Sequence, residues 1–367
     1  MMQWRSAVIT EVQSRWAGTV AYAAELASGD TVRALGYVEN VGDLPVGARV
    51  LLNTTALERG LGTGGFAIVV AAPDHLPAPV DLEQVAGHLV KARYTSVQTM
   101  VLGVDEQDSP EHERLRDADD LGGMPVVVAD LHSALPAVIA GLRASAPTTR
   151  VAYVMTDGGA LPADFSRTVA GLRDSGWLEA CITVGQAYGG DLEAVNVHTG
   201  LLTAHLVVEA DVTVVAQGPG NLGTGTRWGF SGTSAGEAVN AAGVLGGRPV
   251  ASLRVSEADQ RPRHRGLSHH SSTAYGRVAL VPADVPVPRL TEDLARYVHS
   301  QAQALCSSTG GRLRLVEVDC EGLEDALRSA PVRLSTMGRG LDEDRLSFLT
   351  AAAAGRHAAA LITPRPR

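Results

Sequence analysis

Two apolar runs, Pro125-Val-Val-Val-Ala129 and Arg150-Val-Ala-Tyr-Val-Met155, decide the fold of this chain. Both are short, unbroken and rich in valine, as is typical of strands that are buried on both faces. Between them, Ser133 precedes a helical pattern over residues 134–145 and can cap its first turn. A buried strand, a helix and a second buried strand form the unit from which parallel sheets are built.

The same alternation continues through the rest of the chain. We therefore expect residues 124–362 to form an α/β domain with a doubly wound, mostly parallel sheet of at least five strands. Three later strands are expected to end at Val184, Ala216 and Val255, and two more to cover residues 276–281 and 312–318. The helices are expected to cover residues 165–174, 192–209, 234–245, 292–305 and 342–361.

Residues 1–80 have a different texture. Short runs with alternating apolar and polar residues are separated by glycine and proline turns, which predicts a small β-rich, barrel-like N-terminal domain. Residues 81–123 are expected to connect the two domains, and residues 363–367 to form a frayed tail. The expected barrel strands lie near residues 7–12, 18–22, 31–35, 49–53 and 66–70.

The composition excludes several classes of protein. The 367 residues carry a formal net charge of −9 and are 45% hydrophobic, which indicates a globular protein. An acidic chain lacks the broad basic face that nucleic acid or an anionic membrane requires. The widely spaced Cys181, Cys306 and Cys320 form neither a disulfide framework nor a zinc knuckle. Without an apolar segment near Met1 or a membrane-length run, we expect a cytoplasmic protein.

Polar residues follow the expected strands, at the point where each strand ends. Ligands of open parallel sheets bind beyond these carboxyl ends, so we expect the functional site there. The polar residues in question are Asp130, His132, Thr156, Asp157, Gln186, Gln217, Ser256, Glu257 and Asp259.

The last of these strand ends leads into the stretch Arg261-Pro-Arg-His-Arg-Gly-Leu-Ser-His-His270. Like charges packed so closely repel one another unless they hold an anion or a metal. We expect Arg263 and Arg265 to bind an anion. One of three histidines is expected to be a general acid or base or a metal ligand, oriented by a carboxylate. These histidines are His264, His269 and His270, and the carboxylate is that of Asp157 or Asp130.

A divalent metal stays an open alternative. The three histidines together with His132, Asp130, Asp157 and Asp259 offer suitable nitrogen and oxygen ligands. No HExxH-like spacing fixes such a site. Adjacent histidines project apart on a strand, so only one of His269 and His270 is expected to face it.

Two glycine-rich loops are expected at the same edge. Gly190 and Asp191 precede an expected helix, whose amides can bind an anion. The second loop contains a Gly-x-Gly-x-x-Gly pattern from Gly218, but no helix follows promptly and Pro219 removes an amide, which argues against NAD. We expect this loop instead to bind an anion through Gly220, Gly223, Thr224, Gly225 and Thr226, with Arg227 nearby.

Lys91 is the only lysine among the 31 basic residues. A lysine that arginine cannot replace acts as a compact charge, a base or a nucleophile. We expect Lys91 to reach the cleft of the histidine-arginine stretch, so that Lys91→Arg preserves folding and impairs function. An ordinary surface ion pair is the alternative. On a strand, Lys91 and Arg93 would share one face.

The segment Gly232-Thr-Ser-Ala-Gly236 resembles the serine-nucleophile stretch of the peptidase E and cyanophycinase-like hydrolases. The resemblance implies that Ser234 attacks substrate from a sharp turn between a strand and a helix. Alternatively, Ser234 and Glu237 form a capping box at a helix start.

A wider resemblance spans nearly the whole chain. It rests on residues 52–56 with 60–65, Gly87-His88 with Lys91, residues 153–162 and 185–191, and residues 263–270. These stretches resemble an actinobacterial family classified as a domain of unknown function (DUF3866), which implies that they act as one unit without implying a reaction.

The sequence therefore leaves three hypotheses about function. The first is a cytoplasmic enzyme that acts on a small phosphorylated or carboxylated metabolite at the carboxyl edge of the sheet. The second is a serine hydrolase that uses Ser234. The third is a non-catalytic module that senses a metabolite or assists assembly. The oligomeric state stays open.

Overall fold

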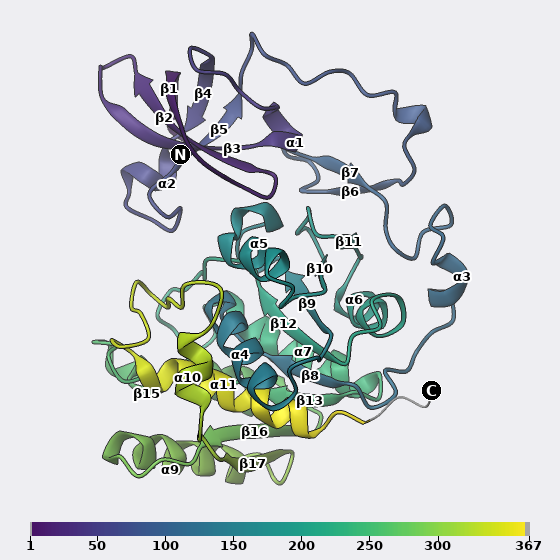
Figure 1. Ribbon diagram of the computed structural model, residues 1–367, viewed down its shortest axis with the longest axis vertical. Coiled ribbons are helices and arrows are strands. Elements are labelled where there is room, and N and C mark those ends of the chain that lie inside the picture. The colour runs from purple at the N-terminus through teal and green to yellow at the C-terminus, as the bar shows by residue number, and fades with distance from the viewer. Residues whose placement is uncertain (1, 364–367) are drawn as a thin grey trace.

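The computed structural model describes residues 2–363, which form a β-barrel and an α/β domain joined by an extended segment (Figure 1). The barrel closes in the order β1-β2-β3-β5-β4, with β3 and β5 parallel and the other pairs antiparallel. This is the topology of an OB-type barrel. The strands are β1 (Trp4–Trp16), β2 (Thr19–Leu26), β3 (Thr31–Tyr37), β4 (Arg49–Asn53) and β5 (Ala67–Ala71).

Alternation along the barrel strands directs one set of side chains inward. Ile9, Tyr22 and Leu52 are almost completely buried in the barrel core. Two short helices, α1 (Val38–Val41) and α2 (Thr55–Glu58), complete this part of the chain. The prediction of a β-rich, barrel-like N-terminal domain is therefore confirmed.

The barrel contacts the α/β domain through the turn between β1 and β2. The Trp16 indole donates a hydrogen bond to the Asp164 carbonyl at 2.8 Å, and the Thr19 hydroxyl donates to the same oxygen. The Arg167 guanidinium lies over the Trp16 ring. The segment that connects the domains contains η1 (Leu82–Gln84), the hairpin of β6 (Leu89–Lys91) and β7 (Thr99–Val101), and α3 (His112–Leu115).

The α/β domain is built on an eight-stranded sheet in the order β11-β10-β9-β12-β8-β13-β16-β17, and all neighbours are parallel. This confirms the predicted fold class. The strands are β8 (Pro125–Val128), β9 (Val151–Thr156), β10 (Ala180–Thr183), β11 (Leu192–Glu193), β12 (Val212–Gln217), β13 (Arg248–Ala251), β16 (Ala283–Pro288) and β17 (Leu313–Val318).

Helices cover both faces of this sheet and create two cores. Along β8, Val126 and Val128 point into one core and Val127 into the other, because side chains alternate along a strand. The first core is covered by α6 (Val197–Leu202), α7 (Ser234–Val244), α9 (Asp293–Ser307) and α8 (His269–Thr273), which continues into the π-helical turn η7 (Ala274–Val278). The second is covered by α4 (Leu135–Ser145), α5 (Arg167–Asp174), α10 (Leu323–Arg328) and α11 (Arg345–Ala360).

Three predicted elements are wrong. Residues 192–209 form β11, α6 and a π-helical turn (η4, Thr203–Val207) rather than one helix. The Asp191 carboxylate accepts a hydrogen bond from the Cys181 amide and keeps the chain extended beside β10. Residues 276–281 are not a strand, since η7 covers their first half.

The third correction concerns the fifth strand of the sheet, which ends at Ala251. Val255 belongs instead to β14 (Val255–Ser256), which pairs with β15 (Gly266–Leu267). Of the predicted frayed tail, residues 364–367 lie outside the described residues. Within residues 2–363, no helix combines the length and the apolar character needed to cross a bilayer.

Candidate functional site

The candidate site lies beyond the carboxyl ends of β8 and β13, where the chain from Ser252 to His270 forms a pinned loop. The β14–β15 ladder pairs Val255 with Leu267, and the Ser268 amide donates to the Arg254 carbonyl at 2.9 Å. Gly266 has a positive φ of 73°, and a Cβ there would lie 2.5 Å from the Gln301 amide oxygen. The loop therefore has fixed ends.

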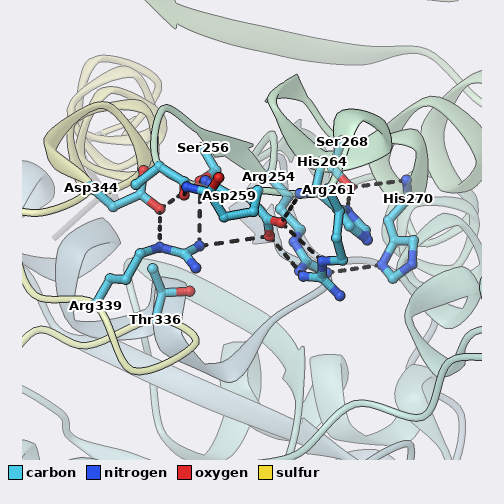
Figure 2. Close-up of polar contacts among 12 residues, drawn as sticks. Arg254, Ser256, Asp259, Arg261, His264, Ser268, His270, Thr336, Arg339 and Asp344 are labelled. Carbon is cyan, nitrogen blue, oxygen red and sulfur yellow. Dashed lines mark hydrogen bonds and ion pairs between the residues drawn. The ribbon is translucent and has the colours of Figure 1, made fainter.

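A network of arginines and carboxylates, here called the frame, holds one side of this loop (Figure 2). The completely buried Asp344 accepts hydrogen bonds from the Ser256 hydroxyl (2.6 Å), the Glu257 amide (2.9 Å) and Arg339 (2.9 Å). Asp259 accepts two hydrogen bonds from the Arg261 guanidinium, which hold the pKa of its carboxyl well below the usual range. Asp259 is thus engaged by arginine and is not part of a metal ligand set.

The three predicted histidines lie together on the other side of the loop. Their ring centroids are 4.5 Å (His269–His270), 4.9 Å (His264–His269) and 4.9 Å (His264–His270) apart. The prediction that only one of His269 and His270 faces the site is wrong, because both belong to the first turn of α8 rather than to a strand. Ser268 caps this turn by accepting a hydrogen bond from the His270 amide.

Each buried histidine ring is oriented by a neighbouring polar group. His264 Nδ1 lies 2.8 Å from the Ser268 hydroxyl. His270 Nδ1 lies 3.0 Å from Arg254 Nη1 and 3.5 Å from Asp130 Oδ2 (Figure 2 shows the contact with Arg254). The Phe230 ring stacks on His270, with centroids 3.8 Å apart and planes 6° apart. Of the two carboxylates predicted to orient a histidine, Asp130 is therefore the one that reaches the cluster.

The environment of His264 and of His269 favours their neutral imidazole forms. Burial, together with the positive charges of Arg254 and Arg261, lowers the pKa of His264 to about 3. Burial and the neighbouring His270 and Arg263 lower the pKa of His269 as well. Neutral imidazole offers a lone pair that can accept a proton or bind a metal.

A groove of about 880 Å³ opens beside His269, and three arginines line it. Arg227, Arg263 and Arg277 have exposed side chains, and within the described residues none of them forms an ion pair. The other lining residues include Gly225, Ser272, Thr273 and Gln301, and no described carboxylate is among them. The groove is therefore an uncompensated cationic surface.

The loop from Gly218 to Gly229 forms one wall of the groove. Its hairpin-like shape is closed by hydrogen bonds from the Thr224 amide to the Gly229 carbonyl and from the Gly229 amide to the Thr226 hydroxyl. Gly225 lies against the Arg263 guanidinium. Gly223 pairs with Phe230, whereas Gly220 lies near Gly159, so only the tip of the predicted anion loop reaches the groove.

Several buried polar atoms at this sheet edge lack a hydrogen-bond partner within the described residues. Hydrogen bonds normally satisfy such atoms, so their concentration at one edge marks a place where water or a ligand completes the structure. The atoms are Asp130 Oδ2, Thr156 Oγ1, Gln217 Oε1, Ser252 Oγ and His269 Nε2.

Lys91 lies at a different place on the same edge. Its Nζ donates to the Thr183 carbonyl (2.9 Å), the Ala187 carbonyl (2.8 Å) and the Glu193 carboxylate (2.7 Å), and the side chain is 3% exposed. Strand β10 is four strand spacings from β13, or roughly 19 Å. Lys91 therefore does not reach the cleft of Arg263 and the histidines, and it is not a surface pair either.

The strand geometry expected around Lys91 is also wrong. Strand β6 ends at Lys91, and Ala92 and Tyr94 follow with positive φ angles of 47° and 62°. The bend separates the buried Lys91 from the exposed Arg93.

Three other predicted residues also lie away from the histidines. Asp157 is exposed and accepts a hydrogen bond from the Gln186 amide at 2.8 Å. Asp191 is bound by Arg173 and the Cys181 amide, and the Gly190 amide donates to Thr183. The helix expected to begin beside Asp191 does not form there, so its amides are not available to an anion.

The remaining candidates have structural partners or face away. Both ring nitrogens of His132 are engaged, one by the Tyr153 hydroxyl at 3.0 Å and one by the Ser166 hydroxyl at 2.7 Å. Arg265 is exposed but does not line the groove.

Ser234 begins α7 and donates to the Ser231 carbonyl, with a 3-10 turn rather than a strand before it. Its hydroxyl caps no amide, because the residue preceding the helix is Thr233. The predicted capping box is therefore wrong.

The sequence-based reasoning missed Arg254, Arg277 and Phe230. A helical interpretation of the residues after Ser268 would have revealed Arg277, because His269, Thr273 and Arg277 recur every four residues and so share one helix face. The strand predicted at 276–281 concealed this stripe. No sequence signal singled out Arg254 or Phe230.

One family model matches all the stretches that form the frame, the histidine cluster and the groove. A family model described as a protein of unknown function (DUF3866) matches residues 33–355. The chain belongs to this family. The DUF3866 match begins within β3 and ends within α11, so it spans the later part of the barrel and nearly all of the α/β domain. Among curated proteins, no significant match to the chain was found.

Proposed function

We propose that this protein is an enzyme that acts on a small phosphorylated or carboxylated metabolite bound in the arginine-lined groove. The observation that carries the proposal is the absence of any described carboxylate opposite Arg227, Arg263 and Arg277 in a groove of about 880 Å³. The acidic composition makes this local excess of positive charge more notable. We also propose that the enzyme is located in the cytoplasm.

The chemistry of arginine favours an anion of this type. Three cations that share a groove repel one another, and an anionic ligand removes this repulsion. The guanidinium group presents planar pairs of donors that match phosphate and carboxylate oxygens. Ser272 and Thr273 add hydroxyl groups to the same wall, and Gly225 lets the backbone approach closely.

His269 is the best-placed group for proton transfer. It borders the groove, and its lowered pKa leaves it neutral near pH 7, so that it can accept a proton from substrate or water. His270 and His264 contact it from the buried side, and Asp130 positions His270. In this proposal, the anion in the groove lies next to a group of three imidazoles.

Anion binding is tested first, with inorganic phosphate as the probe. Titration calorimetry on the full chain should detect phosphate binding, and Arg263→Ala and Arg277→Ala should each weaken it by about 10- to 150-fold, since a hydrogen bond to a charged group contributes about 1.5–3 kcal/mol. Arg93→Ala is the matched control, because Arg93 is an exposed arginine outside the groove. Equal phosphate affinity in all four proteins would remove the groove from the proposal.

Catalysis is tested separately from binding. Incubation of the protein with a metabolite extract, followed by mass spectrometry, should reveal an anionic compound that disappears with the wild type. His269→Ala should still bind phosphate and should no longer convert that compound. If no compound is converted while phosphate still binds, the groove belongs to a metabolite sensor rather than to an enzyme.

A further inference from the structure

We propose that His264, His269 and His270 bind a divalent transition metal such as zinc at the inner end of the groove. The inference rests on the proposed function only for the identity of the substrate anion, because the metal site is argued from the histidines themselves. With the ion bound, His269 would be a ligand and no longer the proton acceptor, and a water on the ion would take that role beside the anion.

The rings are spaced as three ligands of one ion would be. With nitrogen–zinc distances of about 2.0–2.1 Å, ligating rings have centroids about 4.5–5.3 Å apart for coordination angles between octahedral and tetrahedral. The observed separations of 4.5, 4.9 and 4.9 Å fall in this range. One nitrogen from each ring lies within 4.8 Å of the other two, so small ring movements bring them to one ion.

The neighbours of the rings are those that metal-binding histidines require. A ligating histidine usually donates its second ring N–H to a hydroxyl, carbonyl or carboxylate. His264 Nδ1 lies 2.8 Å from the Ser268 hydroxyl, and His270 Nδ1 lies 3.5 Å from Asp130 Oδ2. Asp130 Oδ2 and His269 Nε2 are buried without a hydrogen-bond partner among the described residues, which is the second observation that points to a ligand.

Arg254 determines which form of His270 is present without the metal. A guanidinium only donates, so the 3.0 Å contact leaves the lone pair on His270 Nδ1 and the proton on Nε2. In the other tautomer, Nδ1 donates to Asp130 and Nε2 is free to bind an ion. Metal binding therefore selects the tautomer that satisfies the buried Asp130 oxygen.

The nearby arginines do not prevent a cation from binding. Arg254 lies 3.8 Å from Asp130, and Arg261 forms a bidentate pair with Asp259, so carboxylates compensate both. The uncompensated charge sits on the arginines of the groove. Three protein ligands leave a position open at the ion for water or for an anion that these arginines also hold.

Metal binding can be measured without a known substrate. The full chain, purified without an affinity tag and stripped with a chelator, is titrated with Co²⁺ and with Zn²⁺ by calorimetry and visible absorption. We expect one ion per chain and a Co²⁺ spectrum of nitrogen ligation. His269→Ala should weaken binding by more than about 100-fold, and Asp130→Asn by about 10- to 100-fold, as is typical for a partner that orients a ligand.

The control is His198→Ala, because His198 is exposed on α6 and outside the cluster. His269 is only partly buried, so its replacement should preserve folding, and circular dichroism of each variant establishes this. Failure to bind either ion, or equal binding by the wild type and His269→Ala, would overturn the metal site. Metal binding without phosphate binding would leave the site standing and would refute the proposed function alone.

Discussion

Two buried clusters of polar side chains lie at the same edge of the sheet, one around Lys91 and one around the histidines. At Lys91, all three ammonium protons have acceptors, and the Glu193 carboxylate also accepts from Thr183 and from the Gly189 amide. At the histidines, Asp130 Oδ2 and His269 Nε2 lack a hydrogen-bond partner within the described residues. Both clusters are buried, yet only in the first does every buried polar atom have a hydrogen-bond partner among residues 2–363.

The difference separates a structural role from a binding role. Burying a polar group without a hydrogen bond costs free energy. A buried cluster whose polar groups all bond to one another therefore stabilises the fold and leaves no group for a ligand. Lys91 ties the β6–β7 hairpin to β10 and β11 in this way. The histidine cluster lies beside a groove whose arginines likewise form no ion pair within the described residues, and for this reason we propose a ligand from outside the chain.

Lys91→Met should give the largest effect on stability. It leaves the Glu193 carboxylate buried without its counterion, and breaking such a pair costs about 3–5 kcal/mol. Urea unfolding of the full chain measures the loss. Phosphate affinity of the folded protein should stay unchanged, because β10, which Lys91 contacts, lies four strand spacings or roughly 19 Å from β13.

Lys91→Arg sharpens the same test. The planar guanidinium cannot direct donors to the three acceptors that surround the compact ammonium, so this variant should also lose stability, by less than Lys91→Met. A Lys91→Arg protein of full stability and impaired phosphate binding would instead restore the functional role that the sequence predicted.

The fold could be predicted because burial on both faces leaves a direct signature. Runs such as Pro125–Val128 and Val151–Thr156 are apolar throughout, and their order along the chain fixes a parallel sheet. Residues 192–209 failed because their apolar residues fit a helix equally well. The hydrogen bond from the Cys181 amide to Asp191, which keeps the chain extended there, is a tertiary contact without a local signal.

The sequence was sufficient to locate the candidate site, but not to predict which residues contact one another in it. The stretch 261–270 was recognisable by its density of arginine and histidine. Its frame depends on Asp344 and Arg339, which are far away in sequence and meet Ser256 only in the folded chain. For Lys91 the sequence signal was correct but the predicted place was wrong. Its rarity indicated a lysine with a particular role, but it could not indicate where in the fold the side chain lies.

His132 tests the comparison through pH. Burial lowers its pKa to about 4, against about 6.5 in the unfolded chain, so the unfolded state binds the proton more readily. The stability that neutral His132 contributes is fully present above pH 6.5 and is lost as the pH falls through 4. We expect wild type to lose about 2–3 kcal/mol more than His132→Gln between pH 7 and pH 4.

Denaturant unfolding at several pH values measures this difference. Both ring nitrogens of His132 have partners, so its titration should affect stability and leave groove binding at constant pH unaltered. Parallel pH profiles for the two proteins would mean that His132 is already exposed to water, and the structural assignment would fail.

Asp344→Asn should have a smaller effect that links the frame to the groove. The variant weakens hydrogen bonds from Ser256, the Glu257 amide and Arg339, which should cost about 1.5–2 kcal/mol. Because these contacts pin the loop that carries His264, phosphate or metal affinity should fall together with stability. Thr350→Val is a suitable control, since Thr350 is equally buried but bonds only within α11. Unchanged ligand affinity in Asp344→Asn would separate the frame from the site.

Asp157→Ala is expected to have the smallest effect and is the most direct test of where the site ends. The sequence placed Asp157 in the catalytic set, but its carboxylate is exposed and accepts from the Gln186 amide. Loss of this partly exposed hydrogen bond should cost about 0.5–1 kcal/mol, seen as a small fall in thermal stability. Phosphate affinity and metal affinity should match those of wild type within about twofold, because β9 is separated from β13 by two strands, or roughly 14 Å between strand axes. A loss of binding comparable to that of Arg263→Ala would mean that the substrate extends along the sheet edge from the histidines toward β10. The two clusters would then be the ends of one cleft.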